Sequence, residues 1–240
     1  AVMSGKGGVG KSTVAAMVAV GLRRKGYRVG VLDSDITGPS IPKLFGVSEA
    51  PTMSPLGIMP PQTDMGVKIM SINLMLEDEE QAVIWRGPMI ASAIKQFWND
   101  VFWGDLDALV VDMPPGTSDA ALTVMQNLPV TGIVLVTSPQ DLAGMVVRKA
   151  AHMASHLQTP LIGVVENMSY VVCPHCGERY SLFGEGDTKE MADAFNTRFL
   201  GEIGIDPEMA KLGDQGAIET YKSDDFSGVV DEVAGIVEKA

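Results

Sequence analysis

The chain has 240 residues, of which 46% are hydrophobic, and this length suffices for one large domain with a buried core. Its 30 acidic and 18 basic residues give a net charge of -12, which argues against a basic nucleic-acid interface and against attraction to anionic lipid. The longest apolar stretch, residues 14–22, is shorter than the ~20 residues that span a bilayer, and three basic residues follow it where a signal peptide would be cleaved. We therefore expect one domain over residues 1–240 in the cytoplasm, with no nucleic acid and no membrane among its partners.

Short apolar runs alternate along the chain with longer segments of helical spacing. Continuous runs of Val, Ile and Leu are typical of parallel strands buried on both faces, and they predict strands at 28–32, 109–111, 133–136 and 161–165, with weaker candidates at 1–3, 67–72 and 199–203. Helical spacing predicts helices at 12–25, 88–102, 119–127, 140–157, 188–195 and 227–239. This alternation indicates an α/β fold with a mostly parallel open sheet, flanked by helices, that binds ligands at the carboxyl ends of its strands.

Two segments interrupt the alternation. Residues 50–66 contain four prolines, and we expect them to form a surface loop. Residues 170–186 are polar and contain three glycines, so we expect them to form an excursion from the sheet. This excursion carries both cysteines of the chain.

Residues 5–12 match the phosphate-loop pattern G-x-x-x-x-G-K-[ST] and stand between a predicted strand and a predicted helix. Glycines let successive backbone N–H groups point at phosphate oxygens, and the helix N-terminus adds positive partial charge. Lys11 supplies a mobile charge for the β and γ phosphates, and the Ser12 hydroxyl suits Mg²⁺. The residues expected to bind nucleotide here are Gly5, Gly7, Gly8, Val9, Gly10, Lys11, Ser12 and Thr13.

Carboxylates follow two of the predicted strands. Asp33 and Asp35 come after strand 28–32, and Asp112 comes after strand 109–111 and leads into a turn that ends at Gly116. Because the carboxyl ends of parallel strands face the ligand crevice, these side chains are expected near the phosphate loop. Aspartates also cap loops after strands without further function, but three of them beside a phosphate loop favour a site for a nucleotide and its metal.

The base of the nucleotide is expected near a later strand. Asn167 follows strand 161–165 and carries both a donor and an acceptor for an adenine edge, although a helix-capping asparagine would look identical. The sequence contains no Asn-Lys-x-Asp motif of the guanine-specific kind, so we expect ATP rather than GTP.

The spacing of Cys173 and Cys176 indicates metal or redox chemistry, because two cysteines are too few for a disulfide framework. A redox dithiol has this spacing, but such pairs stand at a helix start inside a thioredoxin unit. A zinc knuckle would use the turn at Gly177, yet tetrahedral zinc needs four ligands and only His175 lies close by, between the thiols. In a third interpretation, two subunits contribute four thiolates to a [4Fe–4S] cluster or, equally, to zinc. The residues by themselves leave these alternatives open.

Lys6 is the unusual residue of the phosphate loop, because an ordinary loop of this kind does not need a second lysine there. With it, the loop resembles the deviant phosphate loop of the MinD, ParA and nitrogenase iron protein class of P-loop ATPases. The resemblance implies that Lys6 reaches the nucleotide of a facing subunit, so that hydrolysis depends on a homodimer. It also implies that Lys6, Lys11 and Asp35 are catalytic, with Asp35 orienting the attacking water and Asp33 lying near the metal.

The same resemblance implies roles for residues after the other strands. Asp112 would be a Walker B aspartate that holds the water shell of Mg²⁺, and Gly116 would belong to a loop that senses the γ phosphate. Asp206 and Pro207 would belong to a second loop beside the adenine.

Four motifs in order, at residues 85–89, 112–119, 166–170 and 173–177, resemble the Mrp/ApbC branch of these ATPases, the iron–sulfur cluster carriers. This resemblance implies a homodimer that holds a [4Fe–4S] cluster on Cys173 and Cys176 and passes it to recipient apo-proteins. It gives no role to Trp85 or Arg86. A positioning ATPase of the ParA or MinD sort and a zinc-stapled, nucleotide-dependent scaffold are the alternatives.

Overall fold

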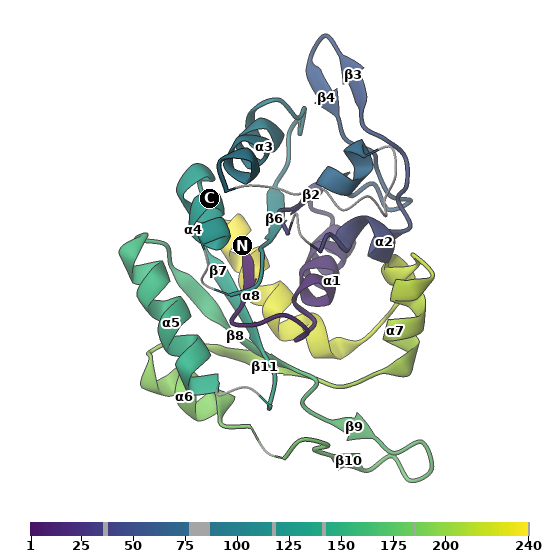
Figure 1. Cartoon of the computed structure of the whole chain (residues 1–240). Coiled ribbons are helices and arrows are strands. Elements are labelled where there is room, and N and C mark those ends of the chain that lie inside the picture. Colours follow the sequence, from purple (N-terminus) through teal and green to yellow (C-terminus); the bar gives the residue numbers. More distant parts are fainter. Residues whose placement is uncertain (36–37, 77–86, 117–118, 141–142, 185, 240) are drawn as a thin grey trace.

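A seven-stranded parallel sheet forms the centre of the molecule (Figure 1). Its order is β11-β8-β7-β1-β6-β2-β5, so the first strand lies between strands from distant parts of the sequence. The computed structural model describes residues 1–35, 38–76, 87–116, 119–140, 143–184 and 186–239. The strands of this sheet are β1 (Val2–Ser4), β2 (Val29–Asp33), β5 (Lys68–Met70), β6 (Ala108–Asp112), β7 (Ile133–Thr137), β8 (Leu161–Asn167) and β11 (Phe199–Ile203).

Helices cover both faces of the sheet and bury one apolar core on each. One core is covered by α1 (Lys11–Arg24), α2 (Ile41–Phe45), α7 (Pro207–Asp214) and α8 (Ser227–Val237). The other is covered by α3 (Gly87–Asn99), α4 (Asp119–Asn127), α5 (Ala143–His156) and α6 (Thr188–Ala194). Short 3₁₀ helices occur at Ile72–Met75, Ile218–Thr220 and Asp224–Phe226. This arrangement confirms the predicted α/β fold.

The apolar runs in the strands supply both cores at once. In β2, Val29 and Val31 belong to the core beneath α1, whereas Leu32 belongs to the core beneath α3 and α4. Successive side chains of a strand point to opposite faces of its sheet, so a strand covered on both faces is apolar at every position. Helix α1 is apolar around most of its circumference for a related reason, since residues 14–20 are all buried between the sheet and α8. No helix in the described part of the chain has both the length and the hydrophobicity to cross a membrane.

The segment 50–66, expected as a surface loop, contains a β-hairpin of β3 (Thr52–Ser54) and β4 (Gly57–Met59). Backbone hydrogen bonds of 2.8 Å join Ile58 to Asp100 and to Phe102, beyond the end of α3. The prolines stand before, between and after the two strands, where they remove no hydrogen bond of the hairpin. The expectation missed this hairpin because its strands are only three residues long, and β4 is held in addition by chain that is distant in the sequence.

Two helices were not predicted, α2 and α7. Both have proline in their first turn, and the side chain of Asp206 caps α7 by accepting a 2.8 Å hydrogen bond from the N–H of Glu208. Such start signals can be read in a sequence. However, helices of five and eight residues are too short to display a periodic apolar pattern.

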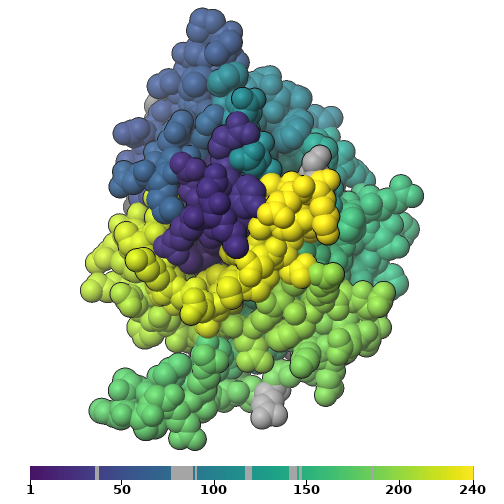
Figure 2. All heavy atoms as spheres, turned by 180° about the vertical axis from the view of Figure 1, so that it is seen from behind, coloured from purple at the N-terminus to yellow at the C-terminus, as the bar shows by residue number. Residues whose placement is uncertain are grey.

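Within the segment expected as an excursion, residues 171–180 form a hairpin separate from the central sheet, with β9 (Val171–Val172) antiparallel to β10 (Arg179–Tyr180). The hairpin extends away from the helices, next to the end of β8 (Figure 1). Seen from behind, this segment projects from the lower edge of the molecule, while α8 lies beside the N-terminal part of the chain (Figure 2). The cysteines therefore stand on a projection rather than in a core.

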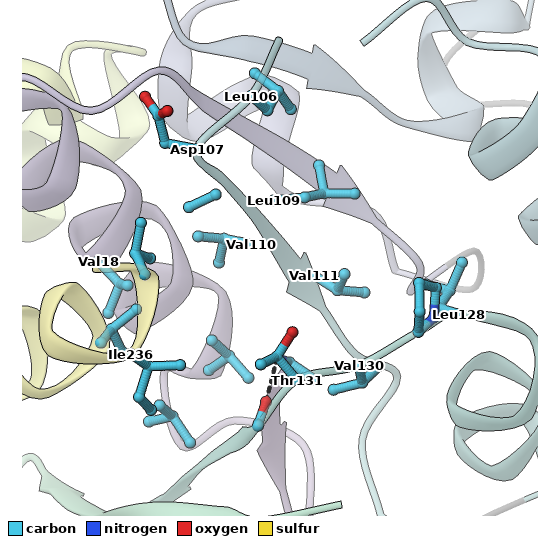
Figure 3. A pocket seen from close by; sticks show the side chains of 18 of the residues that line it. Val18, Leu106, Asp107, Leu109, Val110, Val111, Leu128, Val130, Thr131 and Ile236 are labelled. Carbon is cyan, nitrogen blue, oxygen red and sulfur yellow. Dashed lines mark hydrogen bonds between the residues drawn. The ribbon is translucent and has the colours of Figure 1, made fainter. Parts of the chain in front are cut away.

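A cavity of about 480 Å³ lies at the amino ends of β1, β6 and β7 (Figure 3). Its walls are largely apolar and include Val18, Leu109, Val130 and Ile236. The phosphate loop follows the carboxyl end of β1, so the cavity and the loop lie at opposite edges of the parallel sheet. The cavity is therefore distinct from the site that the motifs predict.

Gly21 allows helix α8 to approach α1 closely. A methyl group at this position would lie 2.4 Å from one Cγ of Val230 and 3.2 Å from its Cβ, and a β-branched side chain has little freedom to turn away. We expect Gly21→Ala to lower the free energy of unfolding by about 1–3 kcal/mol, although alanine favours helices more than glycine does. Urea denaturation followed by circular dichroism measures this change.

Gly235 in α8 provides the matched control, because a methyl group there would meet no atom within 4 Å. Gly235→Ala is expected to raise the free energy of unfolding by up to about 1 kcal/mol through helix propensity alone. Equal effects of the two substitutions would contradict the close packing of α1 against α8.

Candidate functional site

The phosphate loop connects the end of β1 to the start of α1, as the motif requires. Gly8 and Gly10 have φ of +84° and +77°, in the left-handed region that favours glycine, and Gly10 is the N-cap residue of α1. The Ser4 hydroxyl donates a 2.9 Å hydrogen bond to the carbonyl of Lys6, whose side chain is exposed. The loop thus curls over the N-terminus of α1, where backbone N–H groups are available to an anion.

Lys11 and Ser12 open α1, and both bind Asp112 at the end of β6. The Lys11 ammonium forms an ion pair with one carboxylate oxygen, and the Ser12 hydroxyl donates a 2.6 Å hydrogen bond to the other. Lys11 is 6% exposed and Asp112 is fully buried, so a charged pair lies beneath the phosphate loop. The half-buried Thr13 continues the first turn of the helix. The structure therefore brings together the loop lysine, the loop serine and Asp112.

Asp33 ends β2 directly beside Asp112, its register partner in β6. One oxygen accepts the N–H of Asp35 at 3.1 Å, and the other accepts the N–H groups of Ser40 and Ile41 at 3.1 and 3.2 Å. Burial, and after it the neighbouring Asp112 carboxylate, raise the pKa of Asp33 to about 8. Burial also raises the pKa of Asp112, against the opposing effect of Lys11. Two buried carboxyl groups facing one lysine make a site that a further cation would stabilise.

Asp35 and Gly116 lie at the same edge of the sheet. Asp35 is 9% exposed and its N–H is held by Asp33. Gly116 has a φ of +80°, and its N–H donates a 2.8 Å hydrogen bond to the carbonyl of Ser4 at the end of β1. A methyl group on Gly116 would lie 3.7 Å from the carbonyl oxygen of Gly5, so this turn runs alongside the phosphate loop.

Asn167, at the end of β8, contacts the phosphate loop. Its Nδ2 donates a 2.8 Å hydrogen bond to the carbonyl of Val9, and a methyl group on Gly10 would lie 2.2 Å from the same nitrogen. Its Oδ1 is buried and has no hydrogen-bond partner within the described part of the chain. The side chain thus supports the loop with its amide nitrogen and presents a buried acceptor.

Asp206 and Pro207 begin α7, and the Asp206 side chain is held by its own helix. Besides the N–H of Glu208, it accepts a 2.8 Å hydrogen bond from the Tyr221 hydroxyl. Both contacts lie in the C-terminal part of the chain rather than at the phosphate loop. The geometry gives this side chain a capping role, and Pro207 supplies the preset φ of the first helical turn.

The C-x-x-C segment forms the tip of the β9–β10 hairpin. The N–H of Cys173 donates a 2.9 Å hydrogen bond to the carbonyl of Glu178, and the carbonyl of Cys173 accepts one of 2.9 Å from the N–H of Gly177. Gly177 adopts a φ of +73° that closes the turn. Hydrogen bonds from the backbone N–H groups of Cys176 and His175 lower the pKa of the Cys173 thiol. Cys173 is half-buried and Cys176 exposed. The tip therefore favours a thiolate, the form that binds metals.

Exposed apolar side chains lie on the cysteine hairpin and in the chain that follows it. Four such side chains lie on the hairpin and just after it, with 41–53% of their surface exposed: Val172, Tyr180, Leu182 and Phe183. We call these residues the apolar rim. Large exposed apolar side chains close together in the sequence of a projecting segment are typical of a surface that another molecule covers.

The sequence analysis missed two serines that support the aspartates. The Ser34 hydroxyl donates a 2.6 Å hydrogen bond to the carbonyl of Asp112, and the Ser71 hydroxyl, after β5, donates a 3.4 Å one to Asp33. Both are polar residues at the end of a predicted strand, which is the signal that could have found them. Trp85 and Arg86 lie outside the described residues.

The chain is similar in sequence to proteins of one known family. The family model described as "ParA: NUBPL iron-transfer P-loop NTPase" matches residues 1–239. The iron-sulfur cluster carrier protein of Aquifex aeolicus is 48% identical over 217 residues, which are 90% of this chain and 60% of that protein. The carrier protein of Methanocaldococcus jannaschii is 43% identical over 243 residues, covering 99% of this chain and 84% of that protein. The chain thus spans three fifths of the first relative and most of the second.

Two solved structures place the fold. A nucleotide-binding protein from Archaeoglobus fulgidus, in complex with ADP, is 46% identical with a TM-score of 0.86, covering 94% of this chain and 88% of its own. The septum site-determining protein MinD of Pyrococcus horikoshii, complexed with Mg-ADP, is 21% identical with a TM-score of 0.65, covering 99% of this chain and 97% of its own. At 21% identity, the likeness to MinD shows a shared fold and nothing further.

Gly10 is required both for the left-handed φ of the loop and for the approach of Asn167. We expect Gly10→Ala to lower the free energy of unfolding of the nucleotide-free protein by at least about 2 kcal/mol, through strained backbone and displacement of Asn167. Gly7→Ala is the matched control in the same loop, since a methyl group there would meet no atom within 4 Å. Thermal and urea denaturation compare the two variants, and a Gly10→Ala protein as stable as the wild type would disprove this contact.

Proposed function

The chain belongs to the ParA family, in the group described as NUBPL iron-transfer P-loop NTPases, and from this premise we propose that it is an ATP-hydrolysing carrier that assembles a [4Fe–4S] cluster between two copies of itself and passes it to apo-proteins. The family assignment confirms the resemblance that the sequence motifs indicated. One observation carries the proposal. Asn167, the last residue of β8, binds the phosphate loop, and the chain that continues from it carries the thiol pair on a projecting hairpin.

The oxygen donors beside the phosphate loop fit Mg²⁺. The Ser12 hydroxyl and the carboxyl groups of Asp112 and Asp33 supply hard oxygen ligands. Ser12 already donates a hydrogen bond to Asp112, so these two ligands lie side by side. These residues would hold the ion or its water shell, and the bound ion would neutralise charge on the phosphates.

Different residues of the chain would then have different roles in hydrolysis. Lys11 would leave Asp112 and bind the β and γ phosphates. The Gly116 turn, which runs alongside the phosphate loop, would bring its backbone close to the terminal phosphate. Asp35 would orient the attacking water, and Lys6 would reach the nucleotide of the second copy. Catalysis of this kind is mostly positioning and electrostatic stabilisation, which rigid backbone contacts at this edge of the sheet favour.

Asn167 supports adenine over guanine. Its buried Oδ1 needs a donor, because an unsatisfied buried acceptor destabilises a protein by about 1–3 kcal/mol. The amino group of adenine is a donor, whereas guanine presents a carbonyl oxygen at the same position of its ring.

The thiol pair supports cluster binding between two copies. Each chain has two cysteines, and a [4Fe–4S] cluster held by thiolates needs four, so a two-fold pair of chains completes the set. The lowered pKa of Cys173 favours the ligand form, and the apolar rim would be covered by the second copy. The cluster is then cargo that the dimer can release when its interface opens. The same four thiolates suit zinc, so metal analysis decides between them.

The two lysines of the loop should separate binding from turnover. Lys11→Ala should weaken ATP binding at least about tenfold, because a charge-assisted bond to phosphate is lost. Lys6→Ala, the matched control at the exposed position, should bind ATP with nearly wild-type affinity but lose hydrolysis. Calorimetry and phosphate release measure both, and an unchanged affinity in Lys11→Ala would refute the nucleotide site.

The cysteines should be needed for the cluster and for nothing else. Cys176→Ser should keep its fold and its ATP affinity, while iron and sulfide after anaerobic reconstitution fall to background. His175→Ala, between the thiols, should retain the cluster and the cluster-dependent dimer. Metal and sulfide analysis with the visible spectrum and sizing test this, and a full complement of iron and sulfide on Cys176→Ser would count against the bridging site.

A further inference from the structure

A single carboxylate holds the two ends of the cysteine segment together. Glu166, the penultimate residue of β8, is 3% exposed and accepts hydrogen bonds from two hydroxyl groups. The Ser169 hydroxyl, where the chain leaves the sheet, lies 2.8 Å from Oε1. The Thr188 hydroxyl, where the chain returns at the start of α6, binds Oε2. Both serine and threonine are buried, so these bonds are shielded from water.

The returning chain also packs directly on this carboxylate. A methyl group on Gly186 would lie 2.1 Å from Oε2 of Glu166, so a larger residue at this position would displace the carboxylate. The departing chain is fixed by two further backbone bonds, from Ser169 to Ile203 at 3.0 Å and from Ile205 to Tyr170 at 2.7 Å. The hairpin is therefore anchored at a base whose centre is Glu166.

The residues that follow Glu166 contact the phosphate loop. Asn167 binds the carbonyl of Val9 at 2.8 Å. Met168 has a φ of +60°, which is strained for a residue with a side chain, and its Cε lies 3.7 Å from the position of a methyl group on Gly10. The turn 166–169 thus contacts the phosphate loop with its two middle residues and the base of the hairpin with its two outer ones.

We propose that Glu166 is a positioning residue that transmits the nucleotide state of the phosphate loop to Cys173 and Cys176. Nucleotide binding changes the contacts of residues 9 and 10, and Asn167, which binds Val9, is the direct neighbour of the carboxylate that binds both ends of the cysteine segment. Because Ser169 and Thr188 bind the same carboxylate, both ends of the cysteine segment move with the turn rather than separately. This inference rests on the proposed nucleotide site, but it does not require that the cargo be iron and sulfide.

The chain offers a matched pair of threonines to test it. Thr188→Val removes the hydroxyl that binds Glu166 and keeps the shape of the side chain. Thr197→Val, in the chain between α6 and β11, removes a buried hydroxyl that has no hydrogen-bond partner in the part of the chain that the structure describes. Thr188→Ser restores a hydroxyl and is the rescue variant.

The readout is the rate at which N-ethylmaleimide modifies the two cysteines of the metal-free full chain, with and without saturating Mg-ADP. In the wild type the nucleotide should change this rate by about fivefold or more, a typical strength of coupling between sites. Thr188→Val should reduce the change to less than about twofold while its Mg-ADP affinity, measured by calorimetry, stays at the wild-type value. Thr188→Ser and Thr197→Val should behave like the wild type.

Two results would overturn the proposal: a wild type that binds Mg-ADP without any change in thiol reactivity, or a Thr188→Val protein with the full change. Should Thr188→Val not fold, Ser169→Ala removes the bond at the other end and carries the same expectation. Reconstitution with iron and sulfide separates the two hypotheses. Coupled thiols without a cluster would contradict the carrier function alone, and a cluster with uncoupled thiols would contradict the role of Glu166 alone.

Discussion

The buried ion pair between Lys11 and Asp112 holds the phosphate loop against the sheet. A buried charge is strongly destabilising when it lacks a partner, so the lysine at the start of α1 and the aspartate at the end of β6 depend on each other. Ser12 and Ser34 complete the arrangement by binding a side-chain oxygen and the main-chain oxygen of Asp112. In the central sheet β1 lies beside β6, and this order brings the end of β6 next to the phosphate loop that follows β1.

The net charge of -12 is compatible with a phosphate site because binding is decided locally. Exposed charges farther away than about 8 Å are largely screened at physiological salt, whereas backbone N–H groups and a helix N-terminus act at contact distance. Asp33 and Asp112 place carboxyl oxygens at the site itself, where oxygen ligands for a divalent cation are useful. The acidic surface therefore does not prevent the phosphate loop from binding an anion.

The two sites of the molecule are joined by the end of one strand. Asn167 faces the phosphate loop, and Glu166, its neighbour, faces the base of the cysteine hairpin. Successive side chains of a β-strand point in opposite directions, so neighbouring residues of one strand can contact two different sites. The strained Met168 then turns the chain toward the hairpin.

The sequence by itself determined the sheet, most of its helices and the phosphate loop, because each depends on residues that are contiguous. Apolar runs and helical spacing are local patterns, and the motif at residues 5–12 contains its own glycines, lysine and serine. The tertiary structure decided the contacts between residues far apart in the chain. It joined Asn167 to Val9 across 158 positions, turned Asp206 into a helix cap held by Tyr221, and paired β4 with the chain beyond α3. It also made Glu166 the anchor of the hairpin. This carboxylate binds the hydroxyl groups that lie near it in the folded state, and no local sequence pattern indicates which groups these are.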